Sequence, residues 1–246
     1  MSPRAVAVIP VLNEAGAIGP TVAALPRAAV DQVIVVDGGS TDNTVAEARA
    51  AGAEVLSESG AGYGRSCALG AARAHELGAE VALFLDGDGA DPAEEAGRIV
   101  GPVLAGEADF VLATRTRGAR ERGSMGLHQV IAGRLIGAAA GLGAGARYSD
   151  MSAFRAIRLD RLAALGMREM TYGWNLEMQM RAAHGGLRIL EVPLPYRRRI
   201  AGRSKVAGNL RGTLKAGRRI LATLLRTSVA LRRPHGAGMG ARQAGS

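Results

Sequence analysis

Short runs of apolar residues alternate with stretches of helical spacing throughout the first half of this 246-residue chain. The runs are rich in Val and Ile and occupy residues 5–12, 32–37, 54–57, 81–85 and 110–114. Between them, Ala, Leu, Arg and Glu recur at intervals typical of helices in residues 15–25, 42–51, 64–77 and 91–104. Unbroken apolar strands that alternate with helices are typical of parallel sheets buried on both faces. The pattern therefore predicts an α/β fold with a mainly parallel sheet.

Composition indicates one globular domain in a reducing compartment. Hydrophobic residues make up 48% of the chain and charged residues 22%, so a continuous core can be buried. The single cysteine, Cys67, has no partner for an internal disulfide. The start of the chain has no secretory signal, and no uncharged apolar run approaches the roughly 20 residues needed to span a bilayer. We therefore expect a cytoplasmic protein without membrane-spanning helices.

Positive charge is concentrated at the C-terminal end. Residues 197–246 contain 13 Lys and Arg and no acid, whereas the whole chain has a formal net charge of +9. Residues 207–233 predict a basic amphipathic helix that either packs on the protein or lies on an anionic membrane surface. Its predicted apolar face consists of Leu210, Leu214, Leu221, Leu224 and Leu225. Residues 234–246 are Gly, Ala and polar residues, which predicts a disordered tail.

The cationic end of the chain also fits nucleic acid, so a nucleic-acid-binding protein is the more distant alternative. The aromatic content argues against it. Three Phe, four Tyr and one Trp in the whole chain offer few surfaces on which bases could stack. We therefore expect no nucleic-acid partner.

Three of the predicted strands end in acidic or amide residues. Asn13 and Glu14 follow the first strand, Asp37 and Asp42 follow the second, and residues 86–91 (Asp-Gly-Asp-Gly-Ala-Asp) follow the fourth. The carboxyl ends of parallel strands face one crevice, where the ligands of such sheets bind. Carboxylates gathered there repel one another unless a cation lies between them. A bound divalent ion would explain the pattern.

The pair Asp86 and Asp88 suits a hard divalent ion. Two carboxylates on either side of a Gly can offer oxygens to Mg²⁺ or Mn²⁺, while water and diphosphate oxygens complete the coordination. A helix-loop-helix calcium site is excluded, because its sixth position is Asp91 instead of Gly and its twelfth is Gly97 instead of Glu. The phosphate-loop and dinucleotide-binding motifs are absent from the sequence. We expect the metal ligands to be Asp86, Asp88 and Asp91.

The segments VIPVLNE, VIVVDGGSTDNT and LFLDGDGADP, in this order, resemble the nucleotide-sugar-binding half of family 2 glycosyltransferases. The likeness covers roughly residues 5–115. It implies one GT-A type, Rossmann-like domain at residues 1–206, with a donor half at about 1–115 and an acceptor half at about 116–206. It also implies that the donor is a UDP- or GDP-sugar and that Asp86 and Asp88 are catalytic. The donor-binding residues that it implies are Pro10, Asn13, Glu14, Asp37, Gly39, Ser40, Asp42, Arg65 and Asp86.

Two further motifs resemble dolichol-phosphate mannosyltransferases and polyprenyl-phosphate glycosyltransferases. Residues 199–205 match Arg-x-x-Gly-x-Ser-Lys, and residues 150–155 resemble the Asp-x-x-x-Phe segment of that branch. This likeness implies an inverting transfer to a phosphate-bearing, polyprenyl-phosphate acceptor, with Arg199 as a further catalytic residue. With the basic helix, it places the protein peripherally on the inner face of the membrane. The acceptor-phosphate-binding residues that it implies are Arg115, Arg117, Asp150, Arg199, Ser204 and Lys205.

The acceptor half departs from many family members at one position. They carry an adjacent Glu-Asp pair, whose Asp deprotonates an acceptor hydroxyl, where this chain has Trp174 and Asn175. A hydroxyl needs a general base, whereas a phosphate oxygen is already anionic, so the missing pair favours a phosphate acceptor. The alternative is a soluble hydroxyl acceptor with Glu177 or Asp150 as the base. His128 and Arg134, in the Arg-rich stretch of the acceptor half, have no assigned role.

Overall fold

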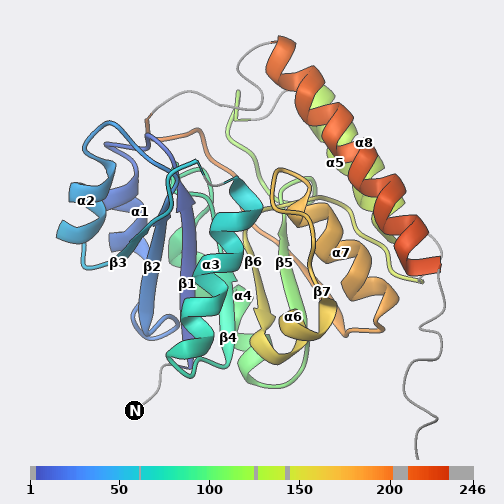
Figure 1. The fold of residues 1–246 in the computed structure, drawn as a ribbon, viewed down its shortest axis with the longest axis horizontal. Coiled ribbons are helices and arrows are strands. Elements are labelled where there is room, and N and C mark those ends of the chain that lie inside the picture. The colour runs from blue at the N-terminus through green and yellow to red at the C-terminus, as the bar shows by residue number, and fades with distance from the viewer. Residues whose placement is uncertain (1–3, 61, 125–126, 142–144, 202–209, 233–246) are drawn as a thin grey trace, which may run out of the picture.

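The computed structural model describes residues 4–60, 62–124, 127–141, 145–201 and 210–232. Its centre is one seven-stranded sheet with the strand order β3, β2, β1, β4, β6, β5, β7 (Figure 1). The strands are Ala5–Val11 (β1), Gln32–Asp37 (β2), Glu54–Ser57 (β3), Val81–Phe84 (β4), Phe110–Thr114 (β5), Arg155–Arg158 (β6) and Ile189–Pro193 (β7). Only β6 runs antiparallel to its neighbours among these pairs, so the predicted mainly parallel sheet is confirmed.

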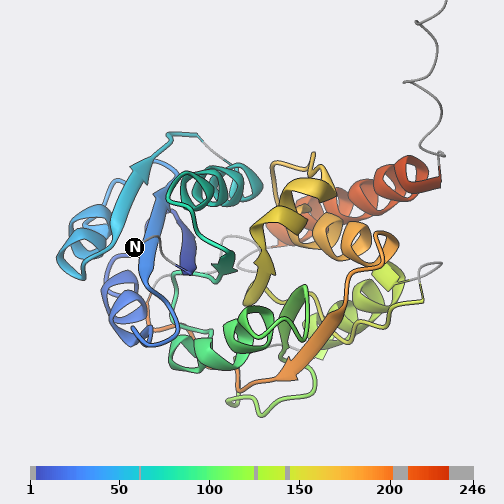
Figure 2. The ribbon, with the colours of Figure 1, turned by 90° about the horizontal axis from the view of Figure 1, so that it is seen from below.

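Helices cover both faces of the sheet, as the view in Figure 2 shows. One face packs against α1, α2 and α4, and the other packs against α3, α6 and α7. Two outer helices, α5 and α8, pack on α7. The helices are Ile18–Ala24 (α1), Thr44–Ala50 (α2), Tyr63–Glu76 (α3), Ala96–Leu104 (α4), Leu127–Gly141 (α5), Leu159–Leu165 (α6), Trp174–His184 (α7) and Leu210–Arg232 (α8), with a short 3-10 turn at Ala93–Glu95.

Strand β1 shows why the apolar runs of the sequence are unbroken. Ala7 and Ile9 face the core on one side of the sheet, whereas Val6 and Val8 face the core on the other, and all four are fully buried. Helix α3 approaches this strand at Gly70, where a Cβ atom would lie 2.2 Å from a methyl carbon of Val8. Only Gly allows that separation.

The predicted elements of the first half match the structure to within a few residues, and the largest differences are the later starts of α1 and α4, at Ile18 and Ala96. The turn before α1 is made by the backbone N–H groups of Ala17 and Ile18, which donate to the carbonyl of Glu14. In the second half, the helix predicted at 127–142 is α5 and the strand predicted at 187–196 is β7. Strand β6 and helix α6 were not predicted from the sequence.

Helix α8 corrects the predicted apolar face. Leu224 packs toward α7, whereas Leu221 and Leu225 are exposed. The inner side instead uses Thr223 and Thr227, which are 1% and 4% exposed. The side chains of Leu210 and Leu214 lie outside the described residues, as do the predicted domain boundary at 206 and the predicted tail at 234–246. Within the described ranges, no helix combines the length and apolar character needed to cross a bilayer.

Asp109 joins the start of β5 to the start of β7. Its buried carboxylate accepts hydrogen bonds from the backbone N–H of Arg188 at 3.0 Å and from the guanidinium Nε and Nη2 at 3.0 and 2.9 Å. The side-chain hydrogen bonds from Arg188 lower the pKa of Asp109 to about 2. Because this folded pKa lies below the unfolded value of about 3.9, the pair stabilises the fold at neutral pH. This contribution is lost as the pH falls from about 4 to about 2.

We therefore expect Asp109→Asn to lower the free energy of unfolding by about 1–2 kcal/mol at neutral pH, a modest value because Arg188 is exposed. The difference from wild type should shrink as the pH falls from about 4 to about 2. Urea unfolding at several pH values measures it, with Glu80→Gln at the exposed pair with Arg4 as the control. Equal stability of wild type and Asp109→Asn at neutral pH would contradict this role.

Candidate active site

The ends of β1 and β2 are joined through Asn13. Its backbone N–H donates to Ser40 Oγ at 2.8 Å, and its Oδ1 accepts the backbone N–H of Thr41 at 2.8 Å. Asn13 has a φ of 50°, the left-handed region that Asn tolerates better than most residues. The loop after Val11 and the loop after Asp37 therefore form one surface at the carboxyl edge of the sheet.

Asp37 shapes the second of these loops. Its carboxylate, 4% exposed, accepts hydrogen bonds from the backbone N–H groups of Gly39 and Ser40 at 3.1 Å. Gly39 has a φ of 102°, which side-chain-bearing residues rarely adopt. Asp42 accepts from Thr44 at the start of α2 and from the N–H of Ala15 at 3.3 Å. All of these residues come from the predicted donor-binding set or its immediate neighbours.

The loop after β4 gathers three carboxylates. Asp88 and Asp91 are 2% and 6% exposed, and the backbone N–H of Asp86 points to Asp91 Oδ2 at 3.4 Å. Burial raises the pKa of Asp86 well above its ordinary value, and the negative charges of Asp88 and Asp91 raise it further. Burial and the charge of Asp88 raise the pKa of Asp91 in the same way. The three groups therefore repel one another in a water-poor place.

Arg199 connects this carboxylate cluster to the end of β1. Its Nη2 lies 2.9 Å from Asp88 Oδ2, and its Nη1 lies 3.9 Å from Glu14 Oε1. The backbone N–H of Ile200 donates to the carbonyl of Asp88 at 2.9 Å, so the segment around Arg199 lies against the loop after β4. The predicted meeting of the first and fourth strand ends is confirmed by these contacts.

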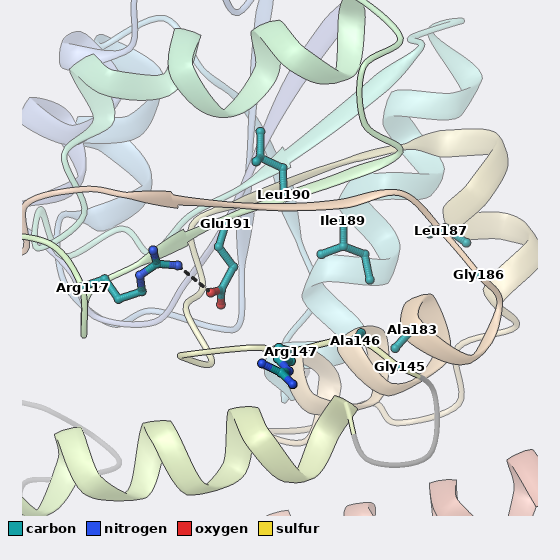
Figure 3. A pocket seen from close by; sticks show the side chains of 10 residues that line it. All are labelled: Arg117, Gly145, Ala146, Arg147, Ala183, Gly186, Leu187, Ile189, Leu190 and Glu191. Atoms are coloured by element: carbon teal, nitrogen blue, oxygen red, sulfur yellow. Dashed lines mark ion pairs between the residues drawn. The ribbon is translucent and has the colours of Figure 1, made fainter.

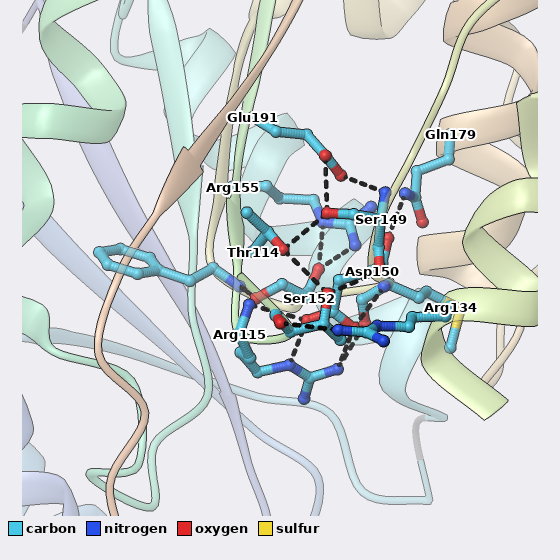
Figure 4. Close-up of polar contacts among 12 residues, drawn as sticks. Thr114, Arg115, Arg134, Ser149, Asp150, Ser152, Arg155, Gln179 and Glu191 are labelled. Carbon is cyan, nitrogen blue, oxygen red and sulfur yellow. Dashed lines mark hydrogen bonds and ion pairs between the residues drawn. The ribbon is translucent and has the colours of Figure 1, made fainter. Parts of the chain in front are cut away.

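Arg115 and Asp150 form a second polar group beside the cluster (Figure 4). Arg115 Nε and Nη2 donate to the two carboxylate oxygens of Asp150 at 2.8 and 2.9 Å, and Asp150 is fully buried. Burial would raise the pKa of Asp150, but the Arg115 guanidinium outweighs it, so the pKa is lowered. The charge of Arg115 also lowers the pKa of Asp86 and Asp91, which places it close to the cluster. Asp150 was predicted to bind the acceptor phosphate, but its buried negative charge would repel a phosphate. We infer that Asp150 instead orients the Arg115 guanidinium.

Tyr196 supports the same guanidinium from the other side. The Arg115 Cζ atom lies 5.2 Å from the centre of the Tyr196 ring, within the range of a cation–π contact. The fully buried Arg155 donates to the carbonyls of Ser152 and Asn175 and fixes the segment that carries Asp150. Neither Tyr196 nor Arg155 was a predicted site residue, and only the order of residues within the two motifs pointed toward them.

Arg117 lines a pocket that does not include Arg115 among its lining residues (Figure 3 draws the side chains that line it). Its Nη1 is 3.8 Å from Glu191 Oε2, at the edge of a pocket of about 520 Å³ between β7 and the end of α7. Arg134 on α5 donates to the carbonyl of Thr116 at 3.3 Å. The predicted phosphate ligands Ser204 and Lys205 lie outside the described residues, and so does the side chain of His128.

Arg65 was predicted to bind the nucleotide-sugar donor, but in the structure its side chain pairs with Glu58. It is exposed on α3, and its guanidinium donates to Glu58 Oε1 at 2.8 and 2.6 Å. Its neighbour Tyr63 lies nearer the carboxylate cluster, since burial and the charge of Asp86 raise the pKa of Tyr63 well above its usual range. Cys67 itself is fully buried, as a small apolar residue would be.

Glu177 occupies a structural position. Its carboxylate is 3% exposed and accepts from the backbone N–H groups of Arg168 and Glu169 at 2.9 and 2.6 Å. Its other oxygen accepts from Arg181 Nε at 2.8 Å. A carboxylate held by three donors in this way is a poor general base. Asn175, beside it on α7, donates instead to the hydroxyl of Tyr63 at 3.3 Å.

No three His, Cys, Asp or Glu side chains within the described ranges already stand in the arrangement of a metal site. At the carboxylate cluster, Arg199 holds Asp88, and Asp91 closes the loop onto the backbone of Asp86. The donor set nevertheless fits a hard cation, since it offers buried carboxylate oxygens whose charges are incompletely balanced.

Residues 6–162 match the family model described as glycosyl transferase family 2. An uncharacterized glycosyltransferase of Mycobacterium tuberculosis is 32% identical over 85% of this chain and 92% of its own length. An undecaprenyl-phosphate mannosyltransferase of Micrococcus luteus is 30% identical over 85% of this chain and 90% of its own length.

Solved structures share the fold. A mycobacterial protein of 23% identity superposes with a TM-score of 0.69 over 92% of this chain and 74% of that chain. Glucosyl-3-phosphoglycerate synthase of M. tuberculosis, solved with Mn²⁺, uridine diphosphate and glucosyl-3-phosphoglycerate, is 25% identical. It superposes with a TM-score of 0.67 over 92% of this chain and 80% of that chain.

Proposed function

The chain belongs to family 2 of the glycosyltransferases, with the GT-A type fold of a hexosyltransferase, and from this premise we propose which sugar-transfer reaction it catalyses. The donor is a UDP- or GDP-sugar, and the acceptor is a polyprenyl phosphate. A divalent ion assists the reaction, and the configuration at the anomeric carbon of the transferred sugar is inverted. The observation that carries this proposal is the cluster of Asp86, Asp88 and Asp91 at the carboxyl edge of the sheet. Arg199 pairs with Asp88 of this cluster and also reaches Glu14.

The donor nucleotide lies along the joined loops of β1 and β2. Asn13, Asp37 and Ser40 build a surface there from hydrogen bonds between the two loops, so its shape is already set before ligand binds. The diphosphate reaches from this surface to the loop after β4. Support comes from the synthase of similar fold, which was solved with uridine diphosphate and Mn²⁺.

Asp86 and Asp88 would hold the Mg²⁺ or Mn²⁺ ion, with Asp91 as a third ligand. The ion supplies charge that stabilises the leaving nucleoside diphosphate. A bound ion would compete with Arg199 for the charge of the Asp88 carboxylate. Arg199 is then free to pair with phosphate oxygens, for which its guanidinium is well shaped.

The acceptor phosphate oxygen attacks the anomeric carbon in a single displacement, and the bond to the nucleoside diphosphate breaks. Arg115, oriented by Asp150 and Tyr196, balances the charge of the incoming phosphate. No side chain has to remove a proton, which agrees with the absence of a free general base at Glu177 or Asp150. The undecaprenyl-phosphate mannosyltransferase among the relatives supports a lipid-linked acceptor. A lipid-linked acceptor in turn favours a peripheral location on the inner face of the membrane.

Acceptor class can be tested with matched substrates. We expect sugar transfer in the presence of Mn²⁺ to a short-chain polyprenyl phosphate and none to the corresponding alcohol, measured as labelled product after chromatography. Glu177→Gln should melt at a lower temperature, because it weakens the contact with Arg181, yet its kcat should stay within about tenfold of wild type. Transfer to the alcohol, together with a large loss of kcat in Glu177→Gln, would instead establish the hydroxyl-acceptor alternative.

A further inference from the structure

Large apolar side chains that remain exposed gather on the two outer helices. Ile131 and Leu135 on α5 are 49% and 66% exposed, and Leu221, Leu225 and Val229 on α8 are 56%, 59% and 56% exposed. These five are half of the ten such side chains in the described part of the chain. Both helices pack on α7 and lie at the end of the molecule opposite α2 (Figures 1 and 2). An apolar concentration of this kind marks an interaction surface.

The orientation of α8 is fixed by its inner side. Thr223 and Thr227 are buried, and Ile220, Leu224 and Leu231 pack against the core on the α7 side. Leu221, Leu225 and Val229 follow one another at intervals of four residues, so they form one line along the helix. This line, called the α8 stripe below, therefore faces away from the protein. A hollow of about 370 Å³ lies beside it.

A buried carboxylate holds the helix in this position. Glu169, 6% exposed, lies on the loop before α7 and accepts a hydrogen bond from Thr223 Oγ1 at 3.1 Å. It also pairs with Arg226 and, at 3.9 Å, with Arg219. The pKa of Glu169 is lowered, because the hydrogen bonds and the charge of Arg226 together outweigh burial, which alone would raise it. The α8 stripe is thus presented by a helix that is already docked.

The positive charge of α8 indicates what kind of partner this surface binds. Helix α8 contains no acid, and Arg218 and Arg232 are exposed beside the α8 stripe. A second copy of the chain would bring like charges together across such an interface. The chain's own residues 233–246 include one large apolar residue, Met239, which is too little to cover the stripe. An anionic lipid surface offers acyl chains to bury the α8 stripe and negative headgroups to pair with the arginines beside it.

We propose that the outer faces of α5 and α8 dock the protein on an anionic bilayer, with the α8 stripe entering the region between headgroups and acyl chains. The proposal deepens the proposed function, on which it rests for the lipid nature of the acceptor. Docking would hold the carboxyl edge of the sheet near a substrate that cannot leave the membrane. Binding to vesicles needs neither donor nor acceptor, so its outcome is independent of the transfer reaction.

The test is co-sedimentation of the full chain with vesicles of phosphatidylcholine, with and without phosphatidylglycerol. We expect wild type to pellet with the anionic vesicles and to be released by high salt, because screening weakens the contribution of the arginines. The triple variant Leu221→Asn, Leu225→Asn, Val229→Asn should bind at least about tenfold more weakly, since each side chain loses apolar burial. Leu190→Asn, an exposed position on β7, is the matched control and should bind as wild type does.

Folding and activity of the triple variant are checked by its melting temperature and by transfer to a water-soluble, short-chain polyprenyl phosphate, both of which should match wild type. Failure of transfer in wild type as well would count against the proposed function and leave the vesicle result standing. Equal vesicle binding by wild type and triple variant would overturn the proposal. So would a wild-type dimer in solution that the triple variant converts to a monomer, because the surface would then join two copies.

Discussion

Asp88→Asn is expected to lower the rate of sugar transfer at least about a thousandfold while the protein stays folded. Asp88 is 2% exposed, and its carboxylate belongs to the group of three that we propose to share a divalent ion with the donor diphosphate. Asn has the same size and can still accept the backbone N–H of Ala90, which donates to Asp88 Oδ1 at 2.9 Å. The substitution therefore removes charge and leaves the loop intact.

A second consequence separates this effect from simple misfolding. Three neighbouring carboxylates repel one another in the absence of a cation, so removing one charge relieves repulsion. The melting temperature of Asp88→Asn without metal should equal or exceed that of wild type, although the lost contact with Arg199 offsets part of the gain. Nucleotide release and thermal melting are measured together, with Glu95→Gln at the exposed pair with Arg98 as the control. An active Asp88→Asn with more than about a tenth of wild-type turnover would contradict the assignment.

Arg199→Ala is expected to lower kcat by roughly 10²–10³-fold, the usual cost of losing a group that stabilises developing charge. Arg199 is the side chain that reaches both Asp88 and Glu14, and it begins the Arg-x-x-Gly-x-Ser-Lys motif. Arg199→Lys should recover only part of the loss, because an ammonium group lacks the planar pair of donors. Steady-state kinetics with saturating donor and acceptor measure kcat for each variant.

The chain offers a matched control two residues away. Arg197 pairs with Glu94 on the surface, with both side chains more than 40% exposed, so Arg197→Ala should change kcat by less than about threefold. If Arg197→Ala and Arg199→Ala lost activity equally, the effect would come from the segment as a whole. In that case Arg199 would have no special part in the reaction.

The donor side of this site was predictable because every part of it follows a local rule. Each apolar run is a strand, each run ends at the same edge of the sheet, Asp37 is the last residue of one run, and Asp86 comes directly after another. Their meeting is therefore a consequence of parallel strand order. The contact of Arg199 with Asp88, which joins the first and fourth strand ends, was not predictable in the same way. Arg199 belongs to the segment that follows β7, far from both ends in the sequence.

The acceptor side depends on pairs that are distant in sequence and do not follow a periodic pattern. Arg115 and Asp150 are 35 residues apart, and nothing in their spacing shows that Asp150 orients the guanidinium. Strand β6 was missed because it has four residues, Arg-Ala-Ile-Arg, and Arg155 is fully buried where a strand pattern would be apolar. Helix α7 likewise buries Glu177 and Gln179 among its apolar residues.

Helix α8 shows why amphipathic patterns can be assigned to the wrong face. The sequence left open whether the Leu face packs on the protein or lies on a membrane, and in the structure Thr223 and Thr227 occupy the packed side, where Glu169 accepts the Thr223 hydroxyl. The leucines at 221 and 225 are left outside. Hydrophobicity alone therefore could not place the helix, since a buried acid on another element decides its rotation.

The central claim is that the acidic loop after β4 and the joined loops of β1 and β2 bind a nucleoside diphosphate together with a divalent ion. The most direct measurement is isothermal titration of UDP and GDP into wild type and Asp88→Asn, each with Mn²⁺ and with EDTA. We predict that Mn²⁺ strengthens binding of one nucleotide to wild type at least about tenfold and leaves Asp88→Asn unchanged. Equal affinity of wild type with Mn²⁺ and with EDTA, for both nucleotides, would contradict the claim.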